Sequence, residues 1–336
     1  MSRKFVGLLF AFVLVVASRS AIAQEPMPAP GASSYLAGTT ESFLASCRSD
    51  VDDGKKRIAA IKATPLPRDA TTTLQAFDTA LVVTVDAENR AGLAEQVHPS
   101  KPFRDDAQTC EQEVSRVLTD ISLDKDMYKV LASLDGSRLD SAGSYYLRTT
   151  LREYHRAGVD RDDPTREKIR QLQDELVKIG QQFDQNIAAD VRKIQVNASD
   201  LDGLPEDFKR SHPADASGKV TLTTDNTDYF PFMDYAKSEA ARKEFFVLYR
   251  QRAYPKNIDV LGQLLQKRHE LANVLGYPDW AAYITEDKMV GTEQHAADFI
   301  EKIATAAQAG SKRAYTELLA YKKHRDPKAC RVNRGV

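Results

Sequence analysis

Apolar residues recur every three or four positions along most of this chain, and this spacing restricts its fold more than any other feature. Alternation with a period of two, which is typical of half-buried strands, is almost missing. The spacing therefore predicts an all-α fold of long helices with at most one short β element. The predicted helices cover residues 35–62, 70–96, 102–134, 139–157, 163–194, 238–252, 257–275 and 293–323.

The clearest of these helices opens with Asp163 as the expected cap and Pro164 at the first helical position, where the missing N–H costs nothing. Its apolar face runs to Ile194, which corresponds to about 31 residues and about 46 Å of helix. Only Lys219–Thr223 alternates like a strand, within a Pro-, Gly- and Asp-rich interval at residues 199–228. We interpret that interval as a domain boundary or a surface insertion.

The amino terminus has the pattern of an export signal. Arg3 and Lys4 precede an apolar run from Phe5 to Ala17, and Ala21-Ile22-Ala23 is a small-residue cleavage site. We expect a signal peptide at residues 1–23, cleaved after Ala23, and an export to the periplasm or the exterior. The alternative is an uncleaved membrane anchor. No second apolar stretch of spanning length follows, so no membrane contact is expected after cleavage.

Beyond the signal peptide, the sequence predicts a Pro-rich linker at residues 24–34, a helical domain at 35–235 and the start of a second domain at 236–336. The 47 basic and 48 acidic residues of the whole chain nearly balance. Such a mixed charge gives no support for a nucleic-acid partner.

Three cysteines in an exported chain suggest one disulfide and one remaining thiol. Cys47 and Cys110 each lie on the apolar face of a predicted helix, and they could form a bridge that closes a loop of about 60 residues. Two reduced, buried cysteines remain the alternative. Cys330 would have no partner.

His269-Glu270-Leu271-Ala272-Asn273 differs by one residue from H-E-x-x-H, which places two imidazoles one helical turn apart on a shared zinc ion. Asn273 is a poor zinc ligand, and no other pair of histidines has the required spacing. We therefore predict a histidine at the edge of a helix and a solvated glutamate. The sequence provides no catalytic, cofactor-binding or metal-binding residue.

Aromatic residues gather at Tyr145-Tyr146 and at Tyr229-Phe230-Pro231-Phe232. They could line a peptide cleft, but at such spacing aromatic residues are more often part of a core.

Several strings share one order and spacing with a known family. They are Tyr145–Arg148, Arg152–Val159, Arg166–Ile169, Leu172–Leu176, Phe183–Ile187, Leu201–Asp207, Asp228–Pro231, Tyr249–Ala253, Arg268–Tyr277 and Lys288–Met289. Together they resemble the thimet oligopeptidase family of zinc metallopeptidases, which includes neurolysin, oligopeptidase A and dipeptidyl carboxypeptidase. The resemblance covers about residues 95 to 325, and it is to the amino-terminal half of these enzymes.

This resemblance implies that the helices form one wall of a deep cleft that admits short peptides. It also implies a zinc ion in the complete enzyme, bound by an H-E-x-x-H motif in the missing carboxyl-terminal half. No zinc is expected on this chain, which is predicted to be inactive alone, and a premature stop or a frameshift near residue 330 is one hypothesis for its end. The alternative function is a non-catalytic, exported helical protein that binds peptides or acts as a scaffold.

Overall fold

A computed structural model describes residues 38–332 of the chain. The predicted signal peptide, its cleavage after Ala23 and the linker at residues 24–34 lie outside the described residues. Within residues 38–332, no helix is both long and apolar enough to cross a membrane.

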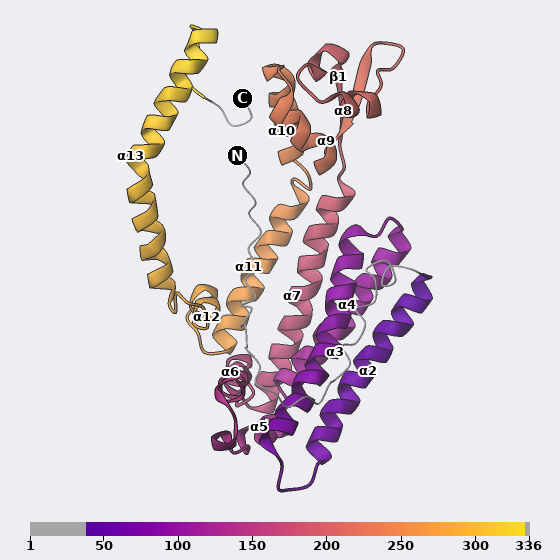
Figure 1. Ribbon diagram of the computed structural model, residues 1–336, viewed down its shortest axis with the longest axis vertical. Coiled ribbons are helices and arrows are strands. Elements are labelled where there is room, and N and C mark those ends of the chain that lie inside the picture. Colours follow the sequence, from indigo (N-terminus) through magenta and orange to yellow (C-terminus); the bar gives the residue numbers. More distant parts are fainter. Residues whose placement is uncertain (1–37, 333–336) are drawn as a thin grey trace, which may run out of the picture. The chain divides into compact units, whose positions relative to one another are not determined.

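The predicted all-α fold is confirmed, and Figure 1 shows long helices with one small sheet. The helices are α2 (Thr40–Ala63), α3 (Ala70–Val97), α4 (Lys101–Ser122), α5 (Lys125–Ala132), α6 (Ser141–Ala157), α7 (Asp163–Ala189), α8 (Glu206–Ser211), α9 (Asn226–Tyr235), α10 (Glu239–Arg250), α11 (Lys256–Val274), α12 (Trp280–Thr285) and α13 (Glu293–Arg325). Two short 3₁₀ turns, Gly136–Arg138 and Ala198–Leu201, join some of them. Strands β1 (Lys193–Asn197) and β2 (Lys219–Thr223) pair antiparallel.

Helices α2, α3 and α4 pack side by side around the largest core (Figure 1). The apolar faces expected from the sequence point into it: α2 buries Cys47, Val51, Gly54, Ile58 and Ile61, and α4 buries Phe103, Ala107, Cys110, Val114, Val117 and Ile121. Side chains cap the starts of α2 and α3, where Thr39 and Asp69 accept hydrogen bonds from the first turn. Amphipathic sequence and capped ends together explain why these helices form.

Helix α7 is shorter than predicted. The cap is Asp162, not Asp163, and the helix ends at Ala189 rather than at Ile194. Ile194 lies in β1 and faces Leu222 of β2. A short apolar run is compatible with either period, and here Ile194 and Val196 alternate with exposed residues and are buried in a second core.

The single helix predicted over residues 102–134 is interrupted after Ser122. Asp124 accepts hydrogen bonds from the N–H groups of Asp126 and Met127, and thus starts α5 as a new helix. The predicted stop at Gly158 is confirmed, because this residue has φ of 94° and ends α6 in the left-handed conformation that glycine favours.

The core residues fall into three clusters. The first belongs mainly to α2–α6, the second to the sheet with α8–α10, and the third to the junction of α7, α11 and α12. Helix α13 adds nothing to them, since none of its 33 residues, all described, is buried. The domain boundary expected at residue 236 stays a prediction.

Candidate functional site

The site that the sequence singles out, residues 269–273, lies on α11 where this helix packs along α7. Leu271 and Ala272 are fully buried there, and Leu271 contributes to the third cluster with Ile169 and Leu172 of α7. Because one side of this helical turn packs into the core, His269 and Asn273 lie on its exposed side.

His269 is already engaged by its neighbour one turn later. The Nδ2 group of Asn273 lies 3.0 Å from His269 Nε2 and also donates to the carbonyl oxygen of His269 at 2.7 Å. When Nε2 is unprotonated, it accepts the amide hydrogen. Asn273 thus occupies the imidazole nitrogen that would have to face a metal in an H-E-x-x-H arrangement.

Glu270 belongs to an ion-pair network between α11 and α7. Its carboxylate lies 2.7 Å from Lys168 Nζ and 3.4 Å from Lys267 Nζ, and Lys267 Nζ lies 2.6 Å from Glu175 of α7. The hydrogen bond from Lys168 is the main reason why the pKa of Glu270 is below its ordinary value. The Glu270 side chain is 35% exposed, and besides its contact with solvent, which the sequence suggested, it pairs with a lysine of α7 and so links two helices.

These residues do not fit the zinc ion that the family resemblance implies. One position of the motif carries an amide, the histidine is bonded to that amide, and the glutamate is paired with lysines. Residues 38–332 also contain no cluster of three or more His, Cys, Asp or Glu side chains placed to hold a metal ion.

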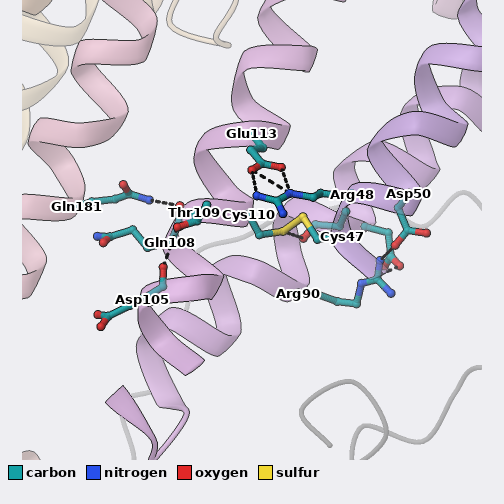
Figure 2. Close-up of a disulfide and its surroundings, with 12 residues drawn as sticks. Cys47, Arg48, Asp50, Arg90, Asp105, Gln108, Thr109, Cys110, Glu113 and Gln181 are labelled. Carbon is teal, nitrogen blue, oxygen red and sulfur yellow. Dashed lines mark hydrogen bonds and ion pairs between the residues drawn. A yellow bond between two sulfur atoms is a disulfide. The ribbon is translucent and has the colours of Figure 1, made fainter. Parts of the chain in front are cut away.

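Cys47 and Cys110 are joined by a disulfide between α2 and α4, with their Cα atoms 6.1 Å apart (Figure 2). Beside it, Arg48 donates from Nε to both carboxylate oxygens of Glu113, at 3.0 and 3.1 Å, and from Nη2 to Oε1 at 2.7 Å. Cys330 is a free, exposed thiol.

The aromatic pairs divide between core and surface. Tyr229 and Phe232 are buried in the second cluster, as the core interpretation expects. Phe230 and Tyr145 are more than half exposed. Tyr145-Tyr146 and Tyr229–Phe232 therefore do not meet in one cluster, since Tyr146 packs against the first core and Tyr229 belongs to the second.

A polar network that the sequence did not reveal connects α3, α4 and α7. Gln108 donates to Glu95 at 3.2 Å, and Gln181 donates to Glu111 at 2.8 Å. Gln185 in turn donates to the side-chain oxygen of Gln108 at 2.6 Å. The one residue that could have indicated this network is Gln181, a polar residue that is buried on α7.

Carboxyl groups in and near this network have raised pKa values. Burial, a hydrogen bond with Glu111 and the charge of Glu111 together raise the pKa of Glu95 to about 8. Burial and the same charge also raise the pKa of Asp184 and of Glu88. The network borders a hollow of about 790 Å³, whose lining includes Glu95, His98, Lys101, Arg104, Asp184 and Gln185. The hollow thus offers cations, amides and carboxyl groups with a raised pKa to a polar ligand.

Comparison with known proteins shows which proteins this chain resembles. The sequence pattern of peptidase family M3 matches residues 232–333. "Probable thimet oligopeptidase" of Arabidopsis thaliana is 24% identical over 62% of this chain and 30% of its own length. Oligopeptidase A of Escherichia coli is 26% identical over 59% of this chain and 32% of its own length. Oligopeptidase A of Haemophilus influenzae is 25% identical over 74% of this chain and 40% of its own length.

The chain thus spans between 30% and 40% of the length of these three relatives. The resemblance predicted from the sequence is confirmed, both in family and in its partial coverage. Part of this chain is similar in sequence to peptidase family M3 and to its oligopeptidases.

Proposed function

We propose that this chain is part of an exported, zinc-dependent oligopeptidase that hydrolyses short peptides. In this proposal residues 38–332 supply a helical scaffold, and the zinc ligands belong to polypeptide other than these 336 residues. The match of residues 232–333 to peptidase family M3 carries the proposal. The names of the relatives, oligopeptidase A and thimet oligopeptidase, support short peptides as the substrate class.

The engaged side chains of α11 support the second part of the proposal. Asn273 holds the imidazole of His269, and Lys168 holds the carboxylate of Glu270. A carboxylate whose pKa is lowered by a lysine is a weak base toward water, so Glu270 is unsuited to the general-base role in peptide hydrolysis.

The test is a metal analysis of the purified chain together with cleavage of a fluorescence-quenched peptide, with and without a chelator. We expect no stoichiometric zinc and no chelator-sensitive cleavage. Any trace of cleavage from contamination should be equally fast in a Glu270→Gln variant. One tightly bound zinc per chain and cleavage that this variant abolishes would overturn the assignment of the ligands to other polypeptide.

The export part of the proposal has a separate test. If the signal is cleaved after Ala23, the mature protein begins at Gln24. Amino-terminal sequencing of protein recovered outside the cytoplasm should find that residue, whereas a protein that begins at Met1 and stays with the membrane would contradict export as a cleaved protein.

Peptide binding without cleavage is a second candidate function, favoured by the hollow between α3, α4 and α7. Lys101 lines the hollow and could attract the carboxylate of a short peptide. We expect a labelled peptide to bind the natural chain and to bind a Lys101→Glu variant at least several-fold more weakly. Lys56→Glu, a matched charge reversal on the exposed side of α2, should leave binding unchanged. Equal binding by all three proteins would remove the hollow from consideration.

A further inference from the structure

Helix α13 carries a long apolar stripe that no other described element covers. Ile300, Ile303, Tyr315, Leu318 and Tyr321 share one side of the helix at 3.6 residues per turn, and 45–67% of each residue is exposed. Between the two apolar groups the same side carries only small residues, which are Ala304, Ala307, Ser311 and Ala314. Exposed stripes of this length on a soluble protein are typical of an interface.

We propose that this stripe is a self-association surface, on which α13 of a second copy of this chain packs antiparallel. The order of the side chains is the first reason, because it is symmetric about the middle of the helix. In an antiparallel pair, Ile300 of one copy lies opposite Leu318 of the other, and Ile303 lies level with Tyr315. Four of the five large side chains therefore meet a large one, and Tyr321 comes level with Ala297. The small residues meet at the centre and allow the helices to approach closely.

The distribution of charge is the second reason. The first half of α13 carries three carboxylates and one lysine: Glu293, Asp298, Glu301 and Lys302. The second half carries five cations and one carboxylate: Lys312, Arg313, Glu317, Lys322, Lys323 and Arg325. Antiparallel packing places the acidic half of one copy beside the basic half of the other, whereas parallel packing would place like charges together.

One pair of charges agrees with the same register. Glu293 of one copy comes level with Arg325 of the other, and both residues lie on the side of the helix that carries the stripe. Lys322, at the edge of the stripe, is already paired with Glu239 of α10 at 2.8 Å, so the charge argument depends on the other cations.

One contact within the chain reaches the stripe. The hydroxyl of Tyr315 accepts a hydrogen bond from the N–H of Val332 at 3.3 Å, so the segment after α13 passes beside this ring, which remains 45% exposed. A twofold-symmetric contact uses the same surface on both copies, so one helix can form it without any further partner.

Sedimentation velocity over a range of protein concentrations measures the association. We expect a reversible monomer–dimer equilibrium that saturates at the dimer. Leu318→Glu should raise the dimer dissociation constant about 100-fold or more, because the twofold axis places the change in the interface twice. Ala309→Glu, on the opposite side of the same helix, should leave it unchanged. A chain that stays monomeric at all concentrations, or a dimer indifferent to Leu318→Glu, overturns the proposal and leaves further polypeptide as the occupant of the stripe.

Thiol cross-linking tests the direction of packing. In a Cys330→Ser background, we expect a short cross-linker to join Ala304→Cys chains to Ala314→Cys chains when the two are mixed. Either variant alone should cross-link poorly, because equal positions are about 15 Å apart along an antiparallel pair. Efficient cross-linking of each variant with itself would indicate a parallel pair, and non-saturating aggregates would indicate unspecific contact. Either outcome contradicts the proposal.

Discussion

At the scale of single residues, Asn273 separates this chain most sharply from a zinc motif. Its amide is bonded to His269 one turn before it, while Glu270 between them is bound to Lys168. The Asn273→His substitution would complete the H-E-x-x-H pattern in the sequence. The geometry around it would still lack a third ligand, because no metal-holding cluster exists within residues 38–332.

We therefore expect the Asn273→His variant to bind zinc only weakly and to cleave no peptide. Two imidazoles one turn apart form half of a zinc site, and the usual catalytic site has three protein ligands. Metal analysis after dialysis and the quenched-peptide assay measure both properties. An Asn273→Ala variant, which loses the bond to His269 without adding a ligand, is the control. Retention of one zinc per chain with chelator-sensitive cleavage would contradict this expectation.

A glycine fixes the distance between α2 and α3. A Cβ atom at Gly54 would lie 2.3 Å from Oγ1 of Thr84, a fully buried hydroxyl that donates to the carbonyl oxygen of Ala80. Gly54→Ala should therefore lower the free energy of unfolding by about 1–3 kcal/mol through overpacking, despite the better helix propensity of alanine. Chemical denaturation measures the change.

The matched control is Gly92→Ala in α3. Nothing lies within 4 Å of a Cβ atom at that position. This substitution should leave the protein equally stable or more stable by up to about 1 kcal/mol, since alanine is the better helix former. If both substitutions had the same effect, the close approach at Gly54 would not be a constraint.

At the scale of elements, the disulfide connects α2 to α4 across 63 residues of chain. In the chain-entropy view, the bridge stabilises the fold by restricting the unfolded chain, by about 4 kcal/mol for a loop of this length. A chain with both Cys47→Ala and Cys110→Ala should therefore unfold at clearly lower denaturant concentration than the natural chain. Cys330→Ser should unfold like the natural chain. An unchanged midpoint in the double variant would show that packing alone holds the two helices.

The carboxyl network between α3, α4 and α7 makes stability depend on pH. The pKa of Glu95 rises from its ordinary value of 4.5 to about 8 on folding, so the folded state binds a proton that the unfolded state has lost. The stabilisation that Glu95 gives to the folded state is fully present below about pH 4.5, and it is lost as the pH rises toward about 8. Acids with a lowered pKa, such as Asp124, change stability in the opposite direction, so the comparison must be made between variants.

Glu95→Gln should remove this dependence, because an amide fills the same space, can still accept from Gln108 and never ionises. We expect the variant to match the natural protein near pH 4.5 and to be more stable at pH 8 and above. Denaturation curves at several pH values measure the difference, and Glu317→Gln on the exposed surface of α13 serves as the control. A difference between Glu95→Gln and the natural protein that does not grow with pH would contradict the role assigned to Glu95.

At the scale of the whole molecule, the sequence predicts what depends on local periodicity and misses what depends on distant partners. The inward faces of α2 and α4 could be read directly, because Val51, Ile58, Val114 and Val117 follow the helical period. The end of α7 could not be predicted from the sequence, because Ile194 fits a helix face as well as a strand face. Only its pairing with Leu222 of β2 decides between the two.

The same limit applies to the candidate site. The missing imidazole at position 273 is visible in the sequence, but the partner of Glu270 is Lys168, about a hundred positions earlier on another helix. Likewise, Glu95 acquires its high pKa only because α4 brings Glu111 to it. Pairings of this kind are set by tertiary packing, which a single sequence does not reveal.

The uneven distribution of the core predicts an uneven distribution of stability. Amides of α3 and α4 lie in the largest cluster beside the disulfide, so they open only with most of the fold. Helix α13 buries none of its residues, so it can open locally at little cost. Hydrogen exchange followed by mass spectrometry should thus find slow exchange in α3 and α4 and fast exchange in α13 in dilute solution. If α13 pairs with a second copy, its protection must rise with protein concentration while that of α3 stays constant, because only α13 gains contacts on association. Strong, concentration-independent protection of α13 would mean that the helix is held within a single chain, and this result would contradict the pairing with a second copy.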